Sequence, residues 1–298
     1  MPATPTTQPR VWFVTGAGRG LGRAFVAAAL DRGDRVIGTV RSADALADLQ
    51  GRHADRLRVL QLDVRGRDAV RRVVDEAAGV FGRLDVVVNN AGYGLVGATE
   101  ELSEDDARDH VDTNLLGPLW VTQAALPHMR AQGSGELVQI STVGAVGSMP
   151  LLGLYNAGKW GLEGFSEALA GEVAAFGVRV TIAQLGGFDT DWGTTSMRFA
   201  DPQGTYDGLR ESLFGTAEVP WPPTAEDPHP LEAPPGRAAA ALLEHLDRGD
   251  DRPLRLLVGD NAPGHVALAL DRRREDYSRD ARFSWPADPG SASPGPAG

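Results

Sequence analysis

The only lysine of the chain lies four residues after a tyrosine, in Tyr155-Asn156-Ala157-Gly158-Lys159. The other 28 of the 29 basic residues are arginines, which indicates that this position needs a compact ammonium rather than a planar guanidinium. On a helix, residues four apart share a face, so Lys159 would hold its charge beside the Tyr155 phenol. A nearby cation lowers the pKa of a phenol from about 10 and makes it a candidate general acid or base. Taken alone, the pair leaves open an ordinary solvated lysine.

A glycine-rich turn offers a second kind of chemistry, the binding of a pyrophosphate. It runs Thr15-Gly16-Ala17-Gly18-Arg19-Gly20-Leu21-Gly22, directly after an apolar run and at the start of a helical pattern. Glycines let the backbone turn tightly and approach the phosphates, and the helix N-terminus supplies N–H donors. Its place between a first strand and a first helix favours a dinucleotide site over a structural turn.

Composition bounds the class of protein. The chain has 298 residues, 42% hydrophobic and 23% charged, with a net charge of −11. An acidic surface repels nucleic acid. The absence of cysteine excludes disulfides and thiolate metal sites, and no apolar run is long enough for a membrane span. We therefore expect a cytoplasmic enzyme or binding protein, with no nucleic-acid or membrane partner.

Two groups of polar residues receive no functional role at this level. The histidines lack metal-ligand spacing and are interpreted as structural or surface residues, so no metal site is expected; they are His53, His110, His128, His229, His245 and His265. An acidic run is interpreted as a solvated helix start, and it comprises Glu100, Glu101, Glu104, Asp105 and Asp106.

Short apolar runs alternate with longer amphipathic stretches. Strands are predicted near 11–14, 35–38, 57–60, 84–88, 137–140, 178–183 and 254–258, and helices near 20–32, 42–51, 67–81, 103–115, 118–132, 153–176 and 236–248. Several of the strands are apolar throughout, as in parallel strands covered on both faces. The alternation predicts a doubly wound parallel seven-stranded sheet flanked by helices, in a single domain over 10–285. Residues 1–9 and 286–298 are expected to be disordered tails.

The segment 187–235 interrupts this pattern. It is long, rich in proline, and carries aromatic residues, among them Trp192, Phe199, Tyr206 and Trp221. Long loops in compact domains are commonly lids over a functional site or disordered insertions. The aromatic content favours a substrate-binding lid, with a mobile insertion as the alternative.

The glycine turn and the Tyr155/Lys159 pair, with the motifs given next, make the chain resemble the short-chain dehydrogenase/reductase family, whose fold is of the Rossmann type. The glycine turn is similar to the family's T-G-x-x-x-G-x-G, and Asn89-Asn90-Ala91-Gly92 to its N-N-A-G. Asn114 and the Tyr155/Lys159 pair stand where the family carries its catalytic Asn and Y-x-x-x-K. The resemblance is close over roughly 10–190.

The resemblance implies roles for four catalytic residues. Tyr155 would be the general acid/base, Lys159 would bind the nicotinamide ribose and lower the tyrosine pKa, and Asn114 would hold a water in the proton path. Thr142 stands thirteen residues before the tyrosine, where the family usually has a serine that orients the substrate oxygen. Ser141 remains the alternative, although on a strand it would face the opposite side.

The resemblance also implies an NADP(H) site. After the second strand no acid is present to bind the ribose of NAD, and Arg41 follows at once. Together with Arg19 it favours NADP over NAD. Asp63 and Val64 would contact adenine, although Asp63 could equally cap the next helix. Further contacts are expected from Asn90, Ala91 and Gly92, and from Gly186, Gly187, Phe188 and Thr190, where the family's usual Pro-Gly has become Gly-Gly.

These features predict an oxidoreductase that interconverts a carbonyl and an alcohol. The substrate would lie under 187–235 against a mostly apolar wall, which predicts a hydrophobic or polycyclic ketone or alcohol; the wall comprises Leu95, Val96, Met149, Leu152 and Trp192. A catalytically silent NADP(H) sensor or an isomerase/dehydratase is the alternative. A homodimer or homotetramer through the helices near 118–132 and 153–176 is expected from the resemblance.

Overall fold

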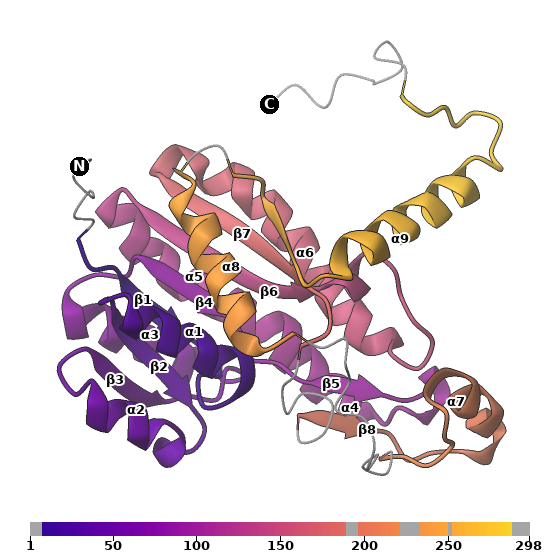
Figure 1. Cartoon of the computed structure of the whole chain (residues 1–298), viewed down its shortest axis with the longest axis horizontal. Helices are drawn as coiled ribbons and strands as arrows, with labels where there is room; N and C mark the ends of the chain where they lie inside the picture. The colour runs from indigo at the N-terminus through magenta and orange to yellow at the C-terminus, as the bar shows by residue number, and fades with distance from the viewer. Residues whose placement is uncertain (1–7, 189–195, 221–232, 250–251, 288–298) are drawn as a thin grey trace.

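A computed structural model describes residues 8–188, 196–220, 233–249 and 252–287, so most of both predicted tails lies outside the described residues. All seven predicted strands join one parallel sheet in the order β3-β2-β1-β4-β6-β7-β9 (Figure 1). Their bounds are β1 Val11–Val14, β2 Arg35–Val40, β3 Leu57–Gln61, β4 Val86–Asn89, β6 Gly135–Thr142, β7 Val178–Leu185 and β9 Arg255–Val258. The predicted fold class is confirmed. The strand order reverses between β1 and β4, and such a reversal opens a crevice at the carboxyl ends of the strands.

The predicted helices are all present, three of them interrupted or extended by short helical turns. Their bounds are α1 Gly20–Asp31, α2 Ala47–Arg52, α3 Arg67–Phe81, α4 Glu104–Val111, α5 Gly117–Gln132, α6 Gly153–Val173 and α8 Pro235–Asp247. The predicted helix 103–115 is α4 followed by a π-helical turn, Asp112–Leu116. None of the described helices is long and apolar enough to cross a membrane.

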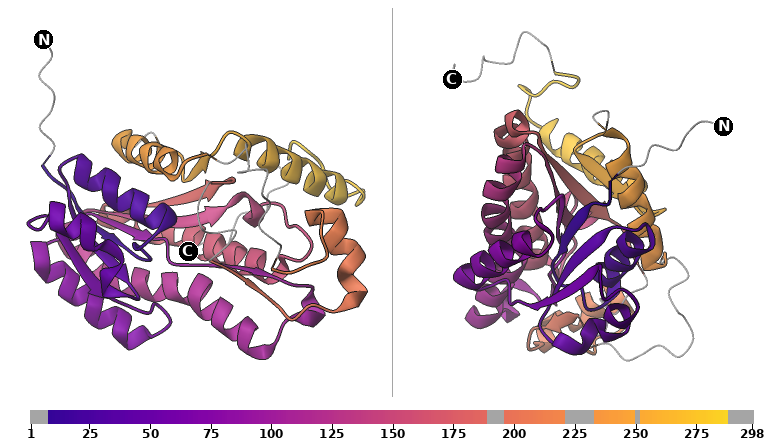
Figure 2. Two further views of the ribbon diagram at one scale, coloured as in Figure 1. Left: turned by 60° about the horizontal axis from the view of Figure 1, so that its bottom comes forward. Right: turned by 90° about the vertical axis from the view of Figure 1, so that its left-hand side faces the viewer.

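Helices cover both faces of the sheet (Figure 2). Alternate residues of β1 serve the two layers: Trp12 and Val14 pack with α1 and α8, whereas Val11 and Phe13 pack with α3, α5 and α6. This division follows from the pleat, because successive side chains of a strand point to opposite faces. Both faces of the strands are therefore apolar, as their valine-rich sequences predict.

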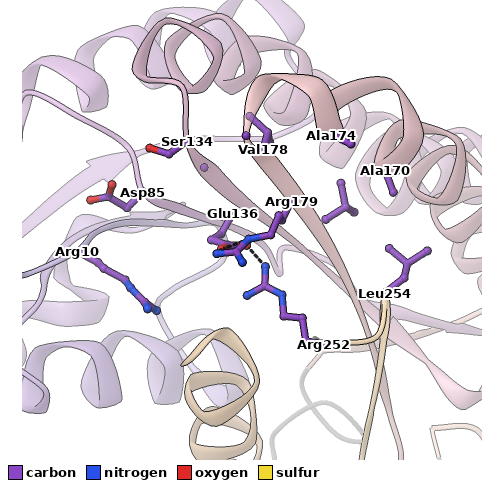
Figure 3. Close-up of a pocket in the computed structure, with 13 residues that line it drawn as sticks. Arg10, Asp85, Ser134, Glu136, Ala170, Ala174, Val178, Arg179, Arg252 and Leu254 are labelled. Carbon is purple, nitrogen blue, oxygen red and sulfur yellow. Dashed lines mark hydrogen bonds and ion pairs between the residues drawn. The ribbon is translucent and has the colours of Figure 1, made fainter. Parts of the chain in front are cut away.

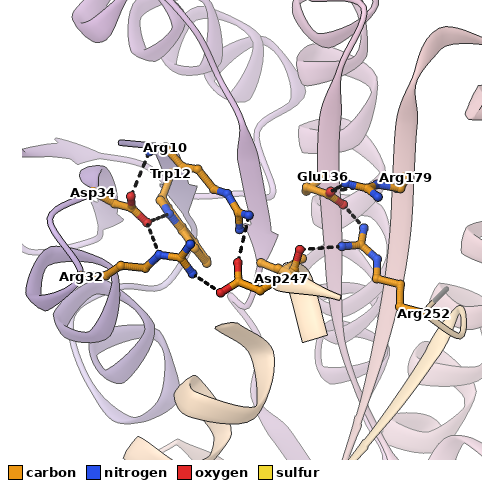
Figure 4. Close-up of polar contacts among 9 residues, drawn as sticks. Arg10, Trp12, Arg32, Asp34, Glu136, Arg179, Asp247 and Arg252 are labelled. Atoms are coloured by element: carbon orange, nitrogen blue, oxygen red, sulfur yellow. Dashed lines mark hydrogen bonds and ion pairs between the residues drawn. The ribbon is translucent and has the colours of Figure 1, made fainter. Parts of the chain in front are cut away.

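Charged side chains tie the start of the chain to α8 at the amino-terminal edge of the sheet (Figure 4). Asp34 accepts hydrogen bonds from the Arg10 backbone N–H and from the Trp12 indole, each at 2.9 Å. Asp247, at the end of α8, pairs with Arg10 at 3.0 Å and Arg32 at 2.7 Å. These contacts fix the outer helix α8 against β1 and α1.

The described part of the predicted lid has secondary structure of its own. β8 (Met197–Phe199) pairs in parallel with β5 (Gly94–Val96), and α7 (Asp207–Phe214) follows. Arg210 of α7 is fully buried against Glu101, with 2.8 Å between Nη1 and Oε1. The interpretation of Glu101 as part of a solvated helix start is therefore wrong: its carboxylate anchors the lid.

A helix that the sequence did not predict, α9 (Ala262–Tyr277), projects from the body of the molecule (Figure 1). Only Ala262 of this helix is buried, and Leu268 and Leu270 are half-exposed. The helix touches the domain through Arg273, which donates to the Val146 carbonyl at 2.6 Å. Without a continuous apolar face, no periodic pattern could have revealed it.

The packing of α8 against the sheet can be tested at His245. It is buried on α8, and neither ring nitrogen has a partner among the described residues. Burial lowers its pKa to about 4, and the charges of Arg252 and Arg248 act in the same direction. An unfolded chain binds a proton at a pKa of about 6.5, so this site contributes stability above that pH and loses it as the pH falls toward 4. We expect His245→Leu to reduce the fall in unfolding free energy between about pH 7.5 and pH 5 by about 2 kcal/mol.

The measurement is urea unfolding at both pH values. The control is His265→Leu, because that side chain is exposed on α9 and its removal should leave the pH dependence as in the wild type. An unchanged pH dependence in His245→Leu would contradict the assignment.

Candidate active site

A cleft of about 560 Å³ opens at the carboxyl edge of the sheet, where the strand order reverses. It collects the cofactor residues that the sequence singled out, apart from Thr190, which lies outside the described residues. Those lining it are Gly16, Gly18, Arg19, Gly20, Leu21, Gly22, Arg41, Asp63, Val64, Asn90, Ala91, Gly92, Gly186, Gly187 and Phe188, together with Ser141, Thr142, Tyr155 and Lys159. Residues from distant parts of the chain thus share one cavity.

The glycine turn has a shape that side chains would prevent. Gly16 adopts a left-handed φ of 65°, and a Cβ on Gly22 would lie 2.3 Å from the Gly16 carbonyl oxygen. Thr15 ties this turn to the end of β4, because its hydroxyl accepts the backbone N–H groups of Asn90 and Ala91 at 3.0 Å each. The glycines thus let the turn pack closely on itself and on the end of β4, and the turn leads into the N-terminus of α1, where backbone N–H groups can bind a phosphate.

Basic side chains gather at the end of the cleft formed by β2 and β3. Arg19, Arg41 and Arg65 all line it. Asp63 is engaged by Arg65, with 2.7 Å between Oδ2 and Nη2, and the resulting hydrogen bonds lower the pKa of the Asp63 carboxyl. This end of the cleft therefore offers guanidinium groups to an anion, while its nearest carboxylate is already paired.

Lys159 is buried, and its Nζ donates to the Ile140 carbonyl at 2.7 Å. One turn further along α6, the buried Glu163 accepts hydrogen bonds from Ser141 at 2.6 Å and Gln184 at 2.9 Å. Burial lowers the pKa of Lys159 to about 8, while the Glu163 carboxylate acts to raise it. Ser141 is thus committed to Glu163.

Tyr155 is buried beside Thr142, with which it shares a hydrogen bond. Burial raises the pKa of Tyr155 to about 12, and the Thr142 contact acts in the opposite direction. The expectation that Lys159 draws this pKa toward neutrality is not met in the structure, because loss of hydration disfavours the phenolate more strongly than its neighbours favour it. The phenol is accordingly protonated at neutral pH.

Asn114 lies in the π-helical turn after α4 and is fully buried. Its side-chain amide bonds both backbone polar groups of Tyr93, accepting from N at 3.0 Å and donating to O at 2.8 Å. It does not line the cleft, but a Cβ on Gly92 would lie 2.6 Å from its Oδ1 and 3.7 Å from Lys159 Nζ. Asn114 and Lys159 therefore both lie next to Gly92.

His110 is a neighbour of the site that sequence reasoning missed. It is fully buried, its Nε2 lies 2.8 Å from Asn114 Nδ2, and its ring meets the Tyr155 ring edge-on at 6.1 Å. Burial lowers the pKa of His110 to about 4, and the Lys159 charge acts in the same direction. The i, i+4 spacing from His110 to Asn114 was the available signal, since it places both side chains on one helix face. Among the described residues, no three His, Asp or Glu side chains gather as a metal site.

The predicted substrate wall does not line the cleft: none of its described residues, Leu95, Val96, Met149 and Leu152, is among the lining residues. Val96 and Leu152 belong to an apolar cluster with Met197 and Phe199 of the lid, and Leu95 is buried. Met149 is 38% exposed, and Trp192 lies outside the described residues. The cleft itself is lined near the lid by Tyr93, Phe188, Ser196 and Arg198.

A second cavity, of about 650 Å³, lies at the opposite, amino-terminal edge of the sheet (Figure 3). Its charged lining is already engaged, because Glu136 binds the guanidinium groups of both Arg179 and Arg252. Ligands of open parallel sheets bind at the carboxyl ends of the strands. The cleft at that edge is therefore the candidate active site.

The different roles of the Ser141 and Thr142 hydroxyls at the end of β6 can be tested by measuring the free energy of unfolding. Ser141→Ala removes a donor from the buried Glu163 carboxylate, and we expect a loss of about 1–3 kcal/mol in unfolding free energy. Thr142→Val is the comparison, because Thr142 makes backbone contacts of 3.3–3.4 Å and bonds the neutral Tyr155 hydroxyl rather than a buried carboxylate, and we expect its loss to cost less. Equal losses in urea unfolding would contradict the separation of roles.

Comparison with known proteins agrees with this geometry. The family model for short chain dehydrogenases matches residues 10–199. An oxidoreductase of Botryotinia fuckeliana, BOA17, is 37% identical over 88% of this chain and 93% of its own length. A 3-ketodihydrosphingosine reductase of Bacteroides thetaiotaomicron is 31% identical over 85% and 88%.

The solved structures agree as well. A short-chain dehydrogenase from Streptomyces avermitilis superimposes with a TM-score of 0.83 and 36% identity, covering 95% of this chain and 100% of its own. Less similar structures with this fold are complexes with NADP or with NAD. The chain belongs to the short-chain dehydrogenase/reductase family of oxidoreductases.

Proposed function

We propose that this protein is an NADP(H)-dependent oxidoreductase that interconverts a ketone or aldehyde and an alcohol, with Tyr155 as general acid/base. One observation carries the proposal. The buried Tyr155–Thr142 pair and Lys159 line the same cleft as the glycine turn, which leads into the N-terminus of α1, and a helix N-terminus can bind a phosphate. This arrangement suits proton transfer beside a bound dinucleotide.

The nucleotide, when bound, supplies or accepts the hydride. In the reductive direction the protonated Tyr155 donates its hydroxyl proton to the oxygen of the reduced carbonyl carbon, which becomes the alcohol. Thr142 orients that oxygen, and the Lys159 ammonium stabilises the phenolate that remains. A proton from solvent then restores Tyr155. Because burial holds Tyr155 in its protonated form, the resting site is prepared for reduction.

The preference for NADP is supported by charge. Arg19 and Arg41 both line the cleft where the phosphate turn and β2 meet, and Asp63 is neutralised by Arg65. Guanidinium groups bind a phosphate in a bidentate manner, whereas the ribose of NAD is usually bound by a free acid.

The substrate is proposed to be a hydrophobic ketone or alcohol that lies in the cleft near Tyr155, beside Tyr93 and Phe188. The relative from Bacteroides, a reductase of a lipid ketone by name, supports this class. Homodimers or homotetramers through α5 and α6 are proposed as well, because Trp160 and Phe176 beside these helices are each 43% exposed.

Replacing the proposed acid tests the chemistry. We expect Tyr155→Phe to lower NADPH-dependent reduction across a panel of ketones by about 100-fold or more, while NADPH binding is retained. Tyr277→Phe is the control, since Tyr277 is exposed on α9. Substantial residual turnover in Tyr155→Phe would contradict its role as general acid/base. If the wild type binds NADPH without any turnover, a sensor is favoured. If the wild type converts a substrate without net consumption of NADPH, an isomerase is favoured.

Replacing the phosphate-binding arginine tests the cofactor. Arg41→Asp exchanges a guanidinium for a carboxylate, and we expect the ratio of kcat/KM for NADPH to that for NADH to fall about 10-fold or more. Arg71→Asp, on the exposed face of α3, makes the same charge change away from the cleft. If both variants keep the wild-type ratio, Arg41 does not read the phosphate.

A further inference from the structure

Four charged residues form a continuous chain of ion pairs from β8 of the lid to the turn after β3. We call this chain the lid bridge, and it comprises Asp63, Arg65, Asp109 and Arg198. Arg198 lies on β8 of the lid, and its Nη1 is 3.2 Å from Oδ2 of Asp109 on α4. The other oxygen of Asp109 is 2.7 Å from Arg65 Nη1. Arg65 in turn binds Asp63 at 2.7 Å. The Asp109 carboxylate thus joins Arg198 of the lid to Arg65, which follows β3.

The lid bridge runs from Asp63 and Arg65, which follow β3, to Arg198, which lies on the Tyr93 ring near His110. Arg65, Asp63 and Arg198 line the cleft, and Arg65 follows β3, at the far edge of the sheet from β6 and β7. The charge of Arg41 contributes to the lowered pKa of Asp63, so Arg41 lies close by. Under the proposed function Asp63 and Arg65 lie in the adenosine half of the cleft, whereas the reacting carbonyl would lie near Tyr155 beyond β4.

Arg198 is held in place by more than one contact. Its guanidinium carbon lies 4.4 Å from the centre of the Tyr93 ring, and β8 is paired with β5 in a register that sets Arg198 opposite Leu95. Tyr93 also lines the cleft, and Asn114 holds its backbone. The cation therefore rests on an aromatic ring that is fixed to the catalytic region.

The ion pairs of the lid bridge are not needed to hold the lid on the domain. The side chains of Arg65, Asp109 and Arg198 are 43%, 39% and 45% exposed, and pairs of this kind contribute little to stability in water. The lid is anchored instead by the buried Arg210–Glu101 pair. A ligand that excludes water from the bridge would strengthen it, because charges interact more strongly where the dielectric constant is lower.

We propose that the lid bridge couples occupation of the adenosine half of the cleft to the position of the lid strand β8, with Arg198 as the positioning residue. The proposal rests on the proposed NADP(H) binding. Binding of the adenosine moiety shields the bridge and fixes β8 over the substrate region, and a fixed β8 in turn strengthens nucleotide binding, since coupling between two sites is reciprocal.

The test uses adenosine 2′,5′-bisphosphate, which carries adenine, ribose and the 2′-phosphate but no nicotinamide. Hydrogen exchange of the amides of β8 and α7 is measured with and without this ligand, and its Kd by calorimetry. In the wild type we expect slower exchange in β8 on binding. In Arg198→Ala we expect that protection to disappear and the Kd to rise about 5-fold.

Two further variants complete the design. Asp109→Asn removes the carboxylate that Arg65 and Arg198 share, and this variant should lose the same protection. Arg198→Lys keeps the positive charge and should retain part of the protection that Arg198→Ala loses. Arg108→Ala, which removes an exposed partner of Glu104 next to Asp109, is the matched control and should behave as the wild type.

The outcomes separate the two proposals. Ligand-induced protection of β8 in Arg198→Ala equal to that of the wild type overturns the coupling, as does binding to the wild type with no change in exchange. Failure of the wild type to bind adenosine 2′,5′-bisphosphate overturns the proposed NADP(H) function, and the coupling with it.

Discussion

The buried ammonium of Lys159 is the constraint on which the rest of the candidate active site depends. A charge removed from water needs hydrogen-bond partners and an opposite charge nearby. The Ile140 carbonyl supplies the first and Glu163 the second. Glu163 is itself buried, and it takes donors from β6, β7 and β9. One face of α6 is thereby fastened to three strands, which fixes the rotation of the helix against the sheet.

That rotation decides where Tyr155 lies and in which form. Tyr155 is one turn before Lys159 on the same face, so it enters the cleft beside Thr142. Burial shifts the pKa of the phenol upward and that of the ammonium downward, so that both groups are drawn toward their uncharged forms. The proximity of a lysine does not by itself make a tyrosine acidic; desolvation of the pair acts more strongly here. Burial therefore leaves Tyr155 protonated at neutral pH.

The parts of the molecule that could be predicted from sequence are those set by local rules. Valine-rich runs became parallel strands covered on both faces, and the glycine turn lies between β1 and α1, where Gly16 has a left-handed φ and Gly22 has no room for a Cβ. The pleat alone separated Thr142 from Ser141, which bonds Glu163 instead. His110 was within reach of the same reasoning, since it shares a helix face with Asn114, but a search limited to metal-ligand spacing passed over it.

The rest depends on contacts between distant parts of the chain. Glu101 looked like its solvated neighbours because its partner, Arg210, comes 109 residues later. The parallel pair β5–β8 joins segments about as far apart, in strands too short to show a pattern. A buried ion pair is costly unless both charges are satisfied, but removing one partner is costlier still, so such a pair specifies one docking geometry more than it adds stability. In this chain the Arg210–Glu101 pair fixes how α7 packs against the residues that precede α4, and no local motif identifies either residue.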